Sequence, residues 1–292
     1  LYITALIMEN KTKVYLLSKS TNKLMHRPFY PNKNVLCVDN IEEADFILAS
    51  STCKNNSISY SQMINHPLFK KYEDKFAIYV NDDDPEFLYD NKKCIKWVSQ
   101  PSRSREENVK HNITTIPLIM SDHYHIDDNT IARLRKNKKI YDFCFIGSVG
   151  CYNRSILKNI EHSKYYFEDT SNFTIYTDMS KQDKIDHIIT FLEKISKSKF
   201  VFCPRGIGSS SFRLYESLMV GSIPIVTGMN DYPFEDAVNW DDFSIRTTLD
   251  GQGLKFAAKT TEEINYNLTR ENGINFWEKY CKMENMYKCL TK

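Results

Sequence analysis

Short apolar runs alternate with polar, helix-like stretches along most of this chain, and that alternation constrains its fold more than any other feature. In the first third, the predicted strands are Lys13–Ser18, Asn34–Val38, Asp45–Ala49, Lys75–Val80 and Cys94–Val98. Helical stretches such as Tyr60–Tyr72 lie between them. Strands and helices in alternation predict a parallel sheet that helices cover on both faces.

A second series of the same kind follows the charged stretch Ser121–Lys139. Its predicted strands are Tyr141–Ile146, Asn172–Thr177, Lys199–Cys203, Ile223–Thr227 and Phe243–Arg246, and its predicted helices are Asn153–Glu161, Lys181–Ser198 and Ser210–Val220. We therefore predict an α/β protein with two Rossmann-like, doubly wound domains that face a cleft. The N-terminal domain is residues 1–125 and the second is residues 126–265; residues 266–292 form a C-terminal helix that could pack back on the N-terminal domain.

The composition excludes several classes of protein. The chain has 292 residues, 41% hydrophobic and 26% charged, as expected for an ordinary globular protein. Its formal net charge is only +2, whereas nucleic-acid-binding proteins usually present a strongly basic face. No apolar run approaches the roughly 20 residues that a membrane-spanning helix needs. Nucleic acid is therefore not an expected partner, and no integral membrane segment is expected.

The cysteine pattern favours reduced thiols. None of the eight cysteines forms a C-x-x-C pair, so zinc ribbons and thioredoxin-like motifs are not indicated. Several lie inside apolar runs, for example Cys144 and Cys203, where a free thiol behaves as a small hydrophobic group. We expect a reducing compartment and a cytoplasmic protein. The alternative is the Golgi lumen, if an N-terminal anchor has been removed.

The segment Ser198–Glu216 carries the strongest chemical pattern. A buried strand ends at Pro204, and a glycine-containing loop leads to serines that cap a helix. Such a loop and helix N-terminus offer backbone N–H groups and a positive dipole end to a phosphate. Arg205 and Arg213 can add bidentate contacts to the same anion, and Glu216 can accept hydrogen bonds from ribose hydroxyls. A glycine and serine turn that caps an ordinary helix is the alternative reading.

Further motifs occur around this segment in a fixed order. They are Phe143-Cys144-Phe145-Ile146-Gly147 followed by Arg154, Pro204-Arg205-Gly206, Ser211-Phe212-Arg213-Leu214-Tyr215-Glu216, Gly221-Ser222-Ile223-Pro224, Pro233-Phe234 and Asn239-Trp240-Asp241-Asp242-Phe243-Ser244. Together they resemble the exostosin family (glycosyltransferase family 47). The resemblance is close over Tyr141–Arg246 and loose in the N-terminal half.

The resemblance implies the GT-B architecture and an inverting glycosyltransferase that needs neither a metal nor another cofactor. The donor would be a UDP-sugar of the xylose, galactose or glucuronate type, and the partner an oligosaccharide or glycoprotein glycan acceptor. The charge of the leaving diphosphate can be stabilised by arginines and a helix N-terminus. The predicted donor-binding residues are Arg154, Arg205, Gly206, Ser209, Ser210, Ser211, Arg213, Glu216 and Tyr232.

An inverting transfer also needs a base for the acceptor hydroxyl. Asp82, Asp83 and Asp84 follow a predicted strand, at the edge of the sheet where such loops bind ligands. Crowded carboxylates should raise at least one pKa, although an aspartate before a proline is also a common turn residue. His26 is a further candidate for catalysis, and His123 and His125 are weaker ones. Tyr232 could equally belong to a buried aromatic pair.

Three other functions are weighed against this one. A metal-dependent glycosyltransferase would use Asp82–Asp84 as a D-x-D site for a divalent cation. A non-catalytic carbohydrate-binding module could keep the same fold. A nicotinamide-dependent oxidoreductase is disfavoured because no strand is followed by G-x-G-x-x-G with an acidic residue about 20 positions later.

Overall fold

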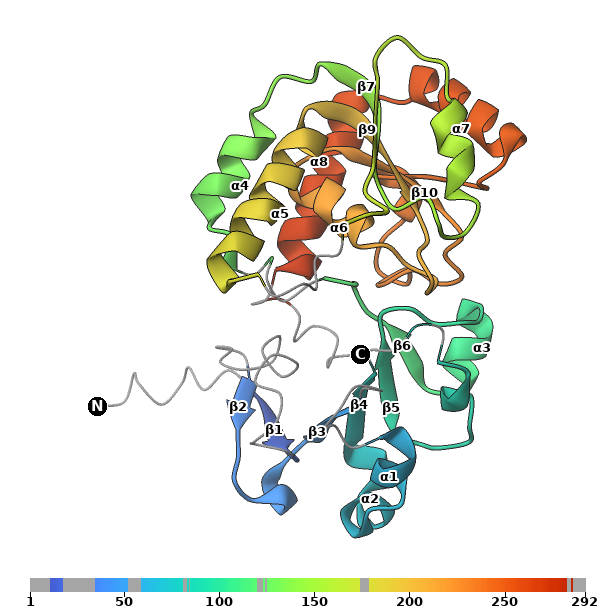
Figure 1. The fold of residues 1–292 in the computed structure, drawn as a ribbon. Helices are drawn as coiled ribbons and strands as arrows, with labels where there is room; N and C mark the ends of the chain where they lie inside the picture. Colours follow the sequence, from blue (N-terminus) through green and yellow to red (C-terminus); the bar gives the residue numbers. More distant parts are fainter. Residues whose placement is uncertain are drawn as a thin grey trace. The chain divides into compact units, whose positions relative to one another are not determined.

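The computed structural model describes residues 11–17, 35–51, 59–80, 83, 85–119, 123, 125–173, 179–282 and 285. The chain divides into two compact units. Unit 1 comprises Leu1–Ile116 with Lys282–Lys292, and unit 2 comprises Pro117–Cys281. Each unit contains its own parallel sheet with helices (Figure 1). The predicted α/β fold with two doubly wound domains is confirmed.

Unit 1 contains a six-stranded parallel sheet in the order β2-β1-β3-β4-β5-β6. The strands are β1 (Thr12–Leu16), β2 (Val35–Cys37), β3 (Phe46–Ser51), β4 (Phe76–Val80), β5 (Ile95–Val98) and β6 (Ile113–Thr115). The helices are η1 (Ile41–Glu43), α1 (Tyr60–Ile64), α2 (Pro67–Lys71), η2 (Glu73–Lys75), η3 (Glu86–Leu88) and α3 (Arg105–Lys110). The strand order reverses between β1 and β3, which is the usual ligand-binding position of such sheets.

The central strands of unit 1 are buried on both faces, which explains their continuous apolar sequence. On β4, Phe76 and Ile78 pack in one cluster, and Ala77 between them is also fully buried. The exception is Lys96 on β5, whose side chain is 0% exposed. Its Nζ donates to Asp90 Oδ1 at 2.6 Å and to two backbone carbonyl oxygens. Because the buried ammonium group is hydrogen-bonded and paired, its desolvation is offset.

Unit 2 contains a five-stranded parallel sheet in the order β11-β10-β9-β7-β8. The strands are β7 (Tyr141–Gly147), β8 (Tyr165–Asp169), β9 (Ser198–Pro204), β10 (Ile223–Thr227) and β11 (Ile245–Thr247). The helices are α4 (Asp128–Arg135), η5 (Arg154–Asn159), α5 (Lys181–Ser196), α6 (Phe212–Met219), η6 (Trp240–Asp242), α7 (Gly251–Glu263), α8 (Tyr266–Phe276) and η7 (Trp277–Cys281).

The second strand of unit 2 was not predicted. This strand is β8, which ends at Asp169. Of the predicted strand Asn172–Thr177, residues 174–177 lie outside the described residues. Phe173 follows a turn in which its N–H donates to the carbonyl of Thr170 at 2.9 Å. The half-buried tyrosines and acidic residues of β8 give no apolar run, so this edge strand lacks the pattern by which its neighbours were predicted.

Side chains of unit 2 alternate between two hydrophobic cores, one on each face of the sheet. On β7, Phe143 and Phe145 pack on the face that carries η5 and α7. Cys144 and Ile146 pack on the face that carries α4, α5, α6 and α8. Over this second face, α4 lies beside α5, α5 beside α6 and α6 beside α8 (Figure 1). Unit 2 thus encloses two complete cores.

The ends of unit 2 lie at other residues than the predicted domain boundaries. Unit 2 begins at Pro117, and Leu118 and Ile126 pack in its helical core. At the other end, α8 belongs to unit 2, whereas Lys282–Lys292 belong to unit 1. An aromatic cluster holds α8 in unit 2, and in it the Phe276 ring centroid lies 5.0 Å from that of Trp240. The packing of residues 266–292 on the N-terminal domain stays a prediction.

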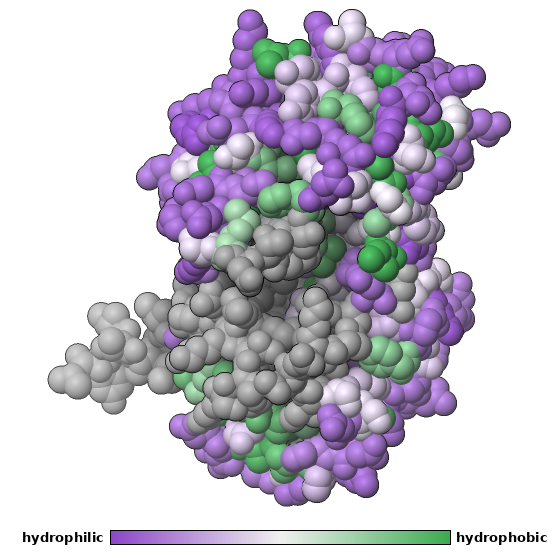
Figure 2. Space-filling view, in the orientation of Figure 1, coloured by the Kyte–Doolittle hydropathy of each residue, from purple (hydrophilic) through white to green (hydrophobic). Residues whose placement is uncertain are grey.

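Hydrophilic residues cover most of the described surface on the face that Figure 2 shows, with hydrophobic residues scattered between them. Among the helices that the structure describes, none is long and apolar enough to cross a membrane.

Candidate functional site

The loop between β9 and α6 lies where the strand order of unit 2 reverses. Strand β7 is flanked by β8 on one side and by β9 on the other. Ligands of doubly wound sheets bind at the carboxyl ends of the strands on either side of such a reversal. Here those ends are Gly147 on β7 and Pro204 on β9, and residues 205–211 connect Pro204 to α6. The predicted phosphate loop therefore has the expected position in the fold.

The N-terminus of α6 carries unsatisfied polar groups. Ser211 is its N-cap residue, but its side chain makes no capping hydrogen bond. The Ser211 hydroxyl is buried without a hydrogen-bond partner, and so is the Thr227 hydroxyl at the end of the adjacent β10. Ser209 and Ser210 are buried as well. A buried, unpaired hydroxyl costs roughly 1–3 kcal/mol, so the hydroxyls of Ser211 and Thr227 are available to pair with a ligand.

Arg213, in the first turn of α6, is held against the end of β7. Its Nε donates to the backbone carbonyl of Ile146. A Cβ atom on Gly147 would lie 2.1 Å from Arg213 Nη2, so the glycine makes room for the guanidinium group. The two terminal nitrogens of Arg213 donate to no residue in the described part of the chain. Burial lowers the pKa of Arg213, while nearby Glu216 acts in the opposite direction. The guanidinium group of Arg213 is therefore fixed in position by its Nε, and no described residue uses the N–H donors of its terminal nitrogens.

Arg154 stabilises the loop between β9 and α6 through hydrogen bonds to backbone carbonyl groups. Its Nε donates to the carbonyl oxygen of Arg205 at 3.0 Å, its Nη2 to that of Pro204 at 3.0 Å and its Nη1 to that of Ser148 at 3.1 Å. Burial, with the nearby charge of Arg213, lowers the pKa of Arg154 to about 10. These contacts explain why an arginine stands here. A direct contact of Arg154 with a ligand stays a prediction.

Arg205 folds back onto its own loop. Its Nε donates to the carbonyl of Gly208 at 3.2 Å and its Nη2 to that of Ile207 at 2.8 Å. The N–H of Gly206 donates to the carbonyl of Ser210 at 3.2 Å and closes the turn. Both residues thus shape the loop, which the motif did not reveal because it identifies an arginine but not its partner.

Glu216 is paired with His123. The glutamate is 8% exposed and its Oε1 lies 2.8 Å from Nε2 of His123, which is 3% exposed. Nδ1 of His123 is buried without a partner. The pair lies beside the apolar side chains of Leu118, Phe212 and Trp277. The sequence offers His123 only as a weak candidate base. Because His123 and Glu216 are 93 positions apart in the chain, no local sequence pattern predicts their contact.

Tyr232 belongs to the aromatic cluster of unit 2. Its ring centroid lies 5.0 Å from that of Trp240, and the Arg246 guanidinium carbon lies 5.2 Å from it. Burial raises the pKa of Tyr232 to about 12. The structure shows the aromatic pair that the sequence offered as the alternative, and a contact with a donor stays a prediction.

In unit 1, only one of the four predicted catalytic residues is described. Asp83 is exposed, and its Oδ1 accepts a hydrogen bond from Nε2 of the mostly buried Gln100 at 2.5 Å. The following helix η3 is capped by Pro85, so Asp83 does not cap it. Asp82, Asp84 and His26 lie outside the described residues. Of the weaker candidates, His125 is exposed.

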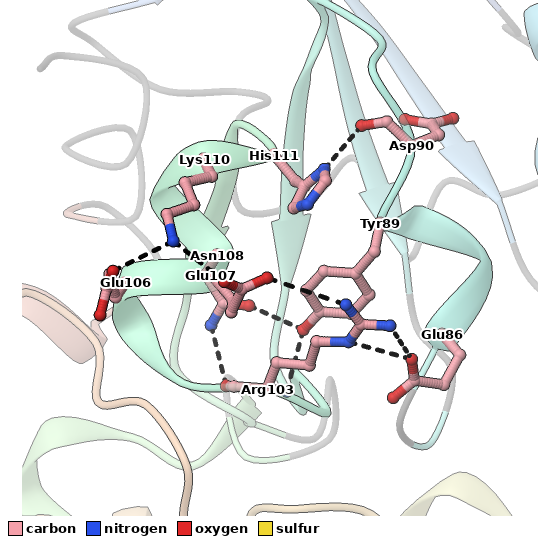
Figure 3. A network of polar contacts seen from close by, with 9 residues as sticks. All are labelled: Glu86, Tyr89, Asp90, Arg103, Glu106, Glu107, Asn108, Lys110 and His111. Atoms are coloured by element: carbon pink, nitrogen blue, oxygen red, sulfur yellow. Dashed lines mark hydrogen bonds and ion pairs between the residues drawn. The ribbon is translucent and has the colours of Figure 1, made fainter.

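A polar network fixes the loops next to Asp83 (Figure 3). Arg103 lies over the ring of Tyr89, with its guanidinium carbon 4.2 Å from the centroid, and donates to Glu86 Oε2 at 2.8 Å. The Tyr89 hydroxyl donates to Asn108 Oδ1 at 2.7 Å. These contacts join η3, which follows β4, to α3, which follows β5, and so stiffen this edge of the sheet.

No cluster of three or more His, Cys, Asp or Glu residues within the described ranges could hold a metal ion. The D-x-D alternative is not decided by this, because two of its three aspartates are outside those ranges.

Two doubly wound α/β units, one with a basic loop at its strand reversal, define an architecture of the kind found among glycosyltransferases. Within that class, the chain belongs to the exostosin GT47 family, since residues 64–251 match the exostosin GT47 domain. The resemblance seen in the sequence motifs is confirmed.

Several known proteins are similar to the chain. An exostosin-1 homolog from Caenorhabditis elegans is 22% identical over 279 residues, which is 86% of this chain and 72% of the worm protein. A "Probable glucuronosyltransferase" from Oryza sativa subsp. japonica is 36% identical over 61 residues, 20% of this chain and 15% of the rice protein. The crystal structure of a glycosyltransferase from Rickettsia africae aligns with a TM-score of 0.40 and 8% identity, covering 97% of this chain and 100% of that one.

Proposed function

We propose that this chain is an inverting glycosyltransferase that moves a sugar from a UDP-sugar to a glycan acceptor without a metal ion. One observation carries the donor site. The terminal nitrogens of Arg213, at the N-terminus of α6, donate to no residue in the described part of the chain, and the buried Ser211 hydroxyl beside them has no hydrogen-bond partner there. Cation, hydroxyl and helix N-terminus together suit the diphosphate of a nucleotide sugar.

The chemistry follows from charge. In an inverting transfer, the acceptor oxygen attacks the anomeric carbon from the face opposite the diphosphate, and UDP leaves with the bonding electrons. The negative charge that develops on the diphosphate would be stabilised by Arg213 and the N-terminal N–H groups of α6. Glu216, oriented by His123, would accept hydrogen bonds from the ribose.

The acceptor hydroxyl must lose a proton, and we assign this role to the aspartates after β4. Asp83 is exposed at the carboxyl edge of the sheet, and its hydrogen bond with Gln100 fixes its direction. Asp82, Asp84 and His26 are the other candidates. The same aspartates could instead bind a divalent cation as a D-x-D site. The two hypotheses differ in whether the transferase activity depends on a metal ion.

The transferred sugar is proposed at the level of class. The rice relative is named as a glucuronosyltransferase, so UDP-glucuronate joins UDP-xylose and UDP-galactose as a donor to test. We further propose a reducing compartment such as the cytoplasm, because Cys144 and Cys203 are free thiols buried in the core of unit 2.

The test is a thermal-shift and calorimetric titration with UDP and the three UDP-sugars, each with and without EDTA. We expect UDP and one sugar nucleotide to stabilise the protein in both conditions. Arg213→Ala should weaken UDP binding roughly 10- to 100-fold, as expected for lost charge-assisted hydrogen bonds. Arg133→Ala, which removes an exposed arginine paired with Glu193 on the surface, is the matched control and should leave binding unchanged.

Three outcomes would contradict the proposal. A response that EDTA abolishes would favour the metal-dependent enzyme with Asp82–Asp84. Binding without turnover for any acceptor would favour a carbohydrate-binding module. A product with retained anomeric configuration, read from its proton coupling by NMR, would overturn inversion.

A further inference from the structure

Tyr152 is held in an unfavourable backbone conformation at the surface of unit 2. Its φ angle is 47°, and that of Asn153 is 56°, so two successive residues other than glycine are left-handed. For a bulky residue such as tyrosine this conformation costs roughly 1–2 kcal/mol. The side chain is nevertheless 53% exposed, so burial of the ring does not repay the strain. Strain that packing does not explain is typical of functional positions.

The surroundings fix the ring from one side. The guanidinium carbon of Arg205 lies 4.1 Å from the ring centroid, and Arg205 Nη1 donates to the Tyr152 hydroxyl at 3.2 Å. Gly228, with φ of +80°, leaves space for both, since a Cβ atom there would lie 2.8 Å from Arg205 and 3.4 Å from the Tyr152 ring. Asn153 Nδ2 donates to the carbonyl of Leu249 at 3.0 Å and anchors the segment. The ring is therefore rigid, with its exposed area away from Arg205.

The ring stands beside the candidate donor site. Arg205 belongs to the loop that leads from β9 to Ser211, and Gly228 directly follows Thr227 at the end of β10. Tyr152 itself follows β7, the third strand whose carboxyl end meets this edge. A ligand whose phosphates lie on the N-terminus of α6 has its remaining part within reach of this edge.

We propose that Tyr152 is the stacking platform for the base of the bound nucleotide. The inference deepens the proposed function and rests on it. The hydroxyl of Tyr152 already accepts a hydrogen bond from Arg205, so the residue offers a ligand its ring face and one O–H donor. A flat face suits an aromatic base, whereas a sugar is recognised mainly through its hydroxyl groups.

The experiment compares two probes that share the diphosphate and differ in the nucleoside, which only UDP carries. UDP and inorganic pyrophosphate are titrated into the full chain and into three variants by calorimetry. Tyr152→Ala should weaken UDP binding about 5- to 100-fold and leave pyrophosphate binding unchanged. Tyr152→Phe keeps the ring and should bind UDP within a few-fold of the unmodified chain. Phe256→Ala removes a similarly exposed aromatic ring, 54% exposed on α7, and should change neither.

Each other outcome contradicts the inference in a distinct way. Equal weakening of UDP and pyrophosphate by Tyr152→Ala would show that the ring only supports Arg205. Weakening of a UDP-sugar but not of UDP would assign the ring to the sugar. Unchanged UDP binding would remove the platform altogether. If the unmodified chain binds neither probe, the proposed function itself fails, and the inference falls with it.

Discussion

Gly147 decides where the guanidinium group of Arg213 lies. We expect Gly147→Ala to weaken UDP binding about 10- to 100-fold, because a Cβ atom would overlap Arg213 Nη2 and displace the cation from the site. The displaced group is the end of a flexible side chain, so the free energy of unfolding should fall by only about 1 kcal/mol. Calorimetric titration and urea unfolding measure the two effects.

Gly150→Ala is the control for this substitution. The nearest atom to a Cβ there is Ser148 Oγ at 3.7 Å, an ordinary contact, so neither affinity nor stability should change. Unaltered UDP affinity in Gly147→Ala would separate Arg213 from the donor site.

His123 and Glu216 form a buried pair whose partners depend on each other. His123→Phe should lower the free energy of unfolding by roughly 3 kcal/mol, because it leaves the Glu216 carboxylate buried without its donor. His123→Gln retains an N–H donor and should lose less. Urea unfolding of His123→Phe, Glu216→Gln and the double variant His123→Phe/Glu216→Gln gives the coupling energy. A double variant that loses the sum of both single losses would show that the two residues are not coupled.

Helix α6 has opposite chemistry at its two ends. Its N-terminus carries the unpaired donors of the candidate site, while its C-terminal carbonyls are covered by cations. Arg135 Nε donates to the carbonyl of Met219 at 2.8 Å, and Arg270 Nε and Lys139 Nζ donate to that of Gly221 at 3.0 and 2.9 Å. Positive charge at this end complements the helix dipole and leaves the other end for an anion.

Lys139 gives this cation cluster a measurable pH dependence. Burial, with the nearby charge of Arg270, lowers its pKa to about 7. The unfolded chain keeps the proton up to about pH 10.5, so between the two values folding releases a proton and stability rises with pH. The effect of this group is at most about 1.4 kcal/mol per pH unit.

The variant Lys139→Met removes that proton. We expect its free energy of unfolding, measured in urea between pH 7 and 9.5, to rise less steeply with pH than that of the unmodified chain. Lys136→Met, at an exposed position nearby, should keep the original slope. Parallel slopes for all three proteins would show that Lys139 stays protonated in the folded state.

Unit 2 contains everything that the proposed donor site requires. Both of its hydrophobic cores are enclosed within Pro117–Cys281, as are Arg213, Ser211 and Tyr152. We expect this fragment to unfold cooperatively and to bind UDP within a few-fold of the full chain, as measured by circular dichroism and calorimetry. The same fragment with Arg213→Ala is the control. A folded fragment that does not bind UDP would place essential donor contacts outside unit 2.

Most of the architecture could be predicted because buried strands appear in the sequence as short apolar runs that alternate with helix-like stretches. The apolar runs of β4, β9 and β10 are typical of parallel strands that are buried on both faces of a sheet. β8 was missed because it is half-buried and polar, so its residues form no apolar run. The apolar stripe of α8 shows that this helix packs, but it does not show on which sheet.

The sequence predicts where the candidate site lies in the fold, but not what each of its residues contacts. A loop with glycine, serine and arginine after a buried strand predicts an anion site at the N-terminus of α6. It does not say that Arg154 and Arg205 bind backbone carbonyls while Arg213 keeps its donors. The pairing of His123 with Glu216 joins distant parts of the chain and leaves no local pattern.

The sequence of β9 also has a consequence before the chain is folded. Its run Phe200-Val201-Phe202-Cys203 is buried between β7 and β10, and in an unfolded chain it would be a segment prone to aggregate. Lys199 stands at one end of the run and Pro204 and Arg205 at the other, and such residues oppose strand pairing between chains. Pro204 and Arg205, the first residues of the candidate site, thus also oppose aggregation of the unfolded chain through its central strand β9.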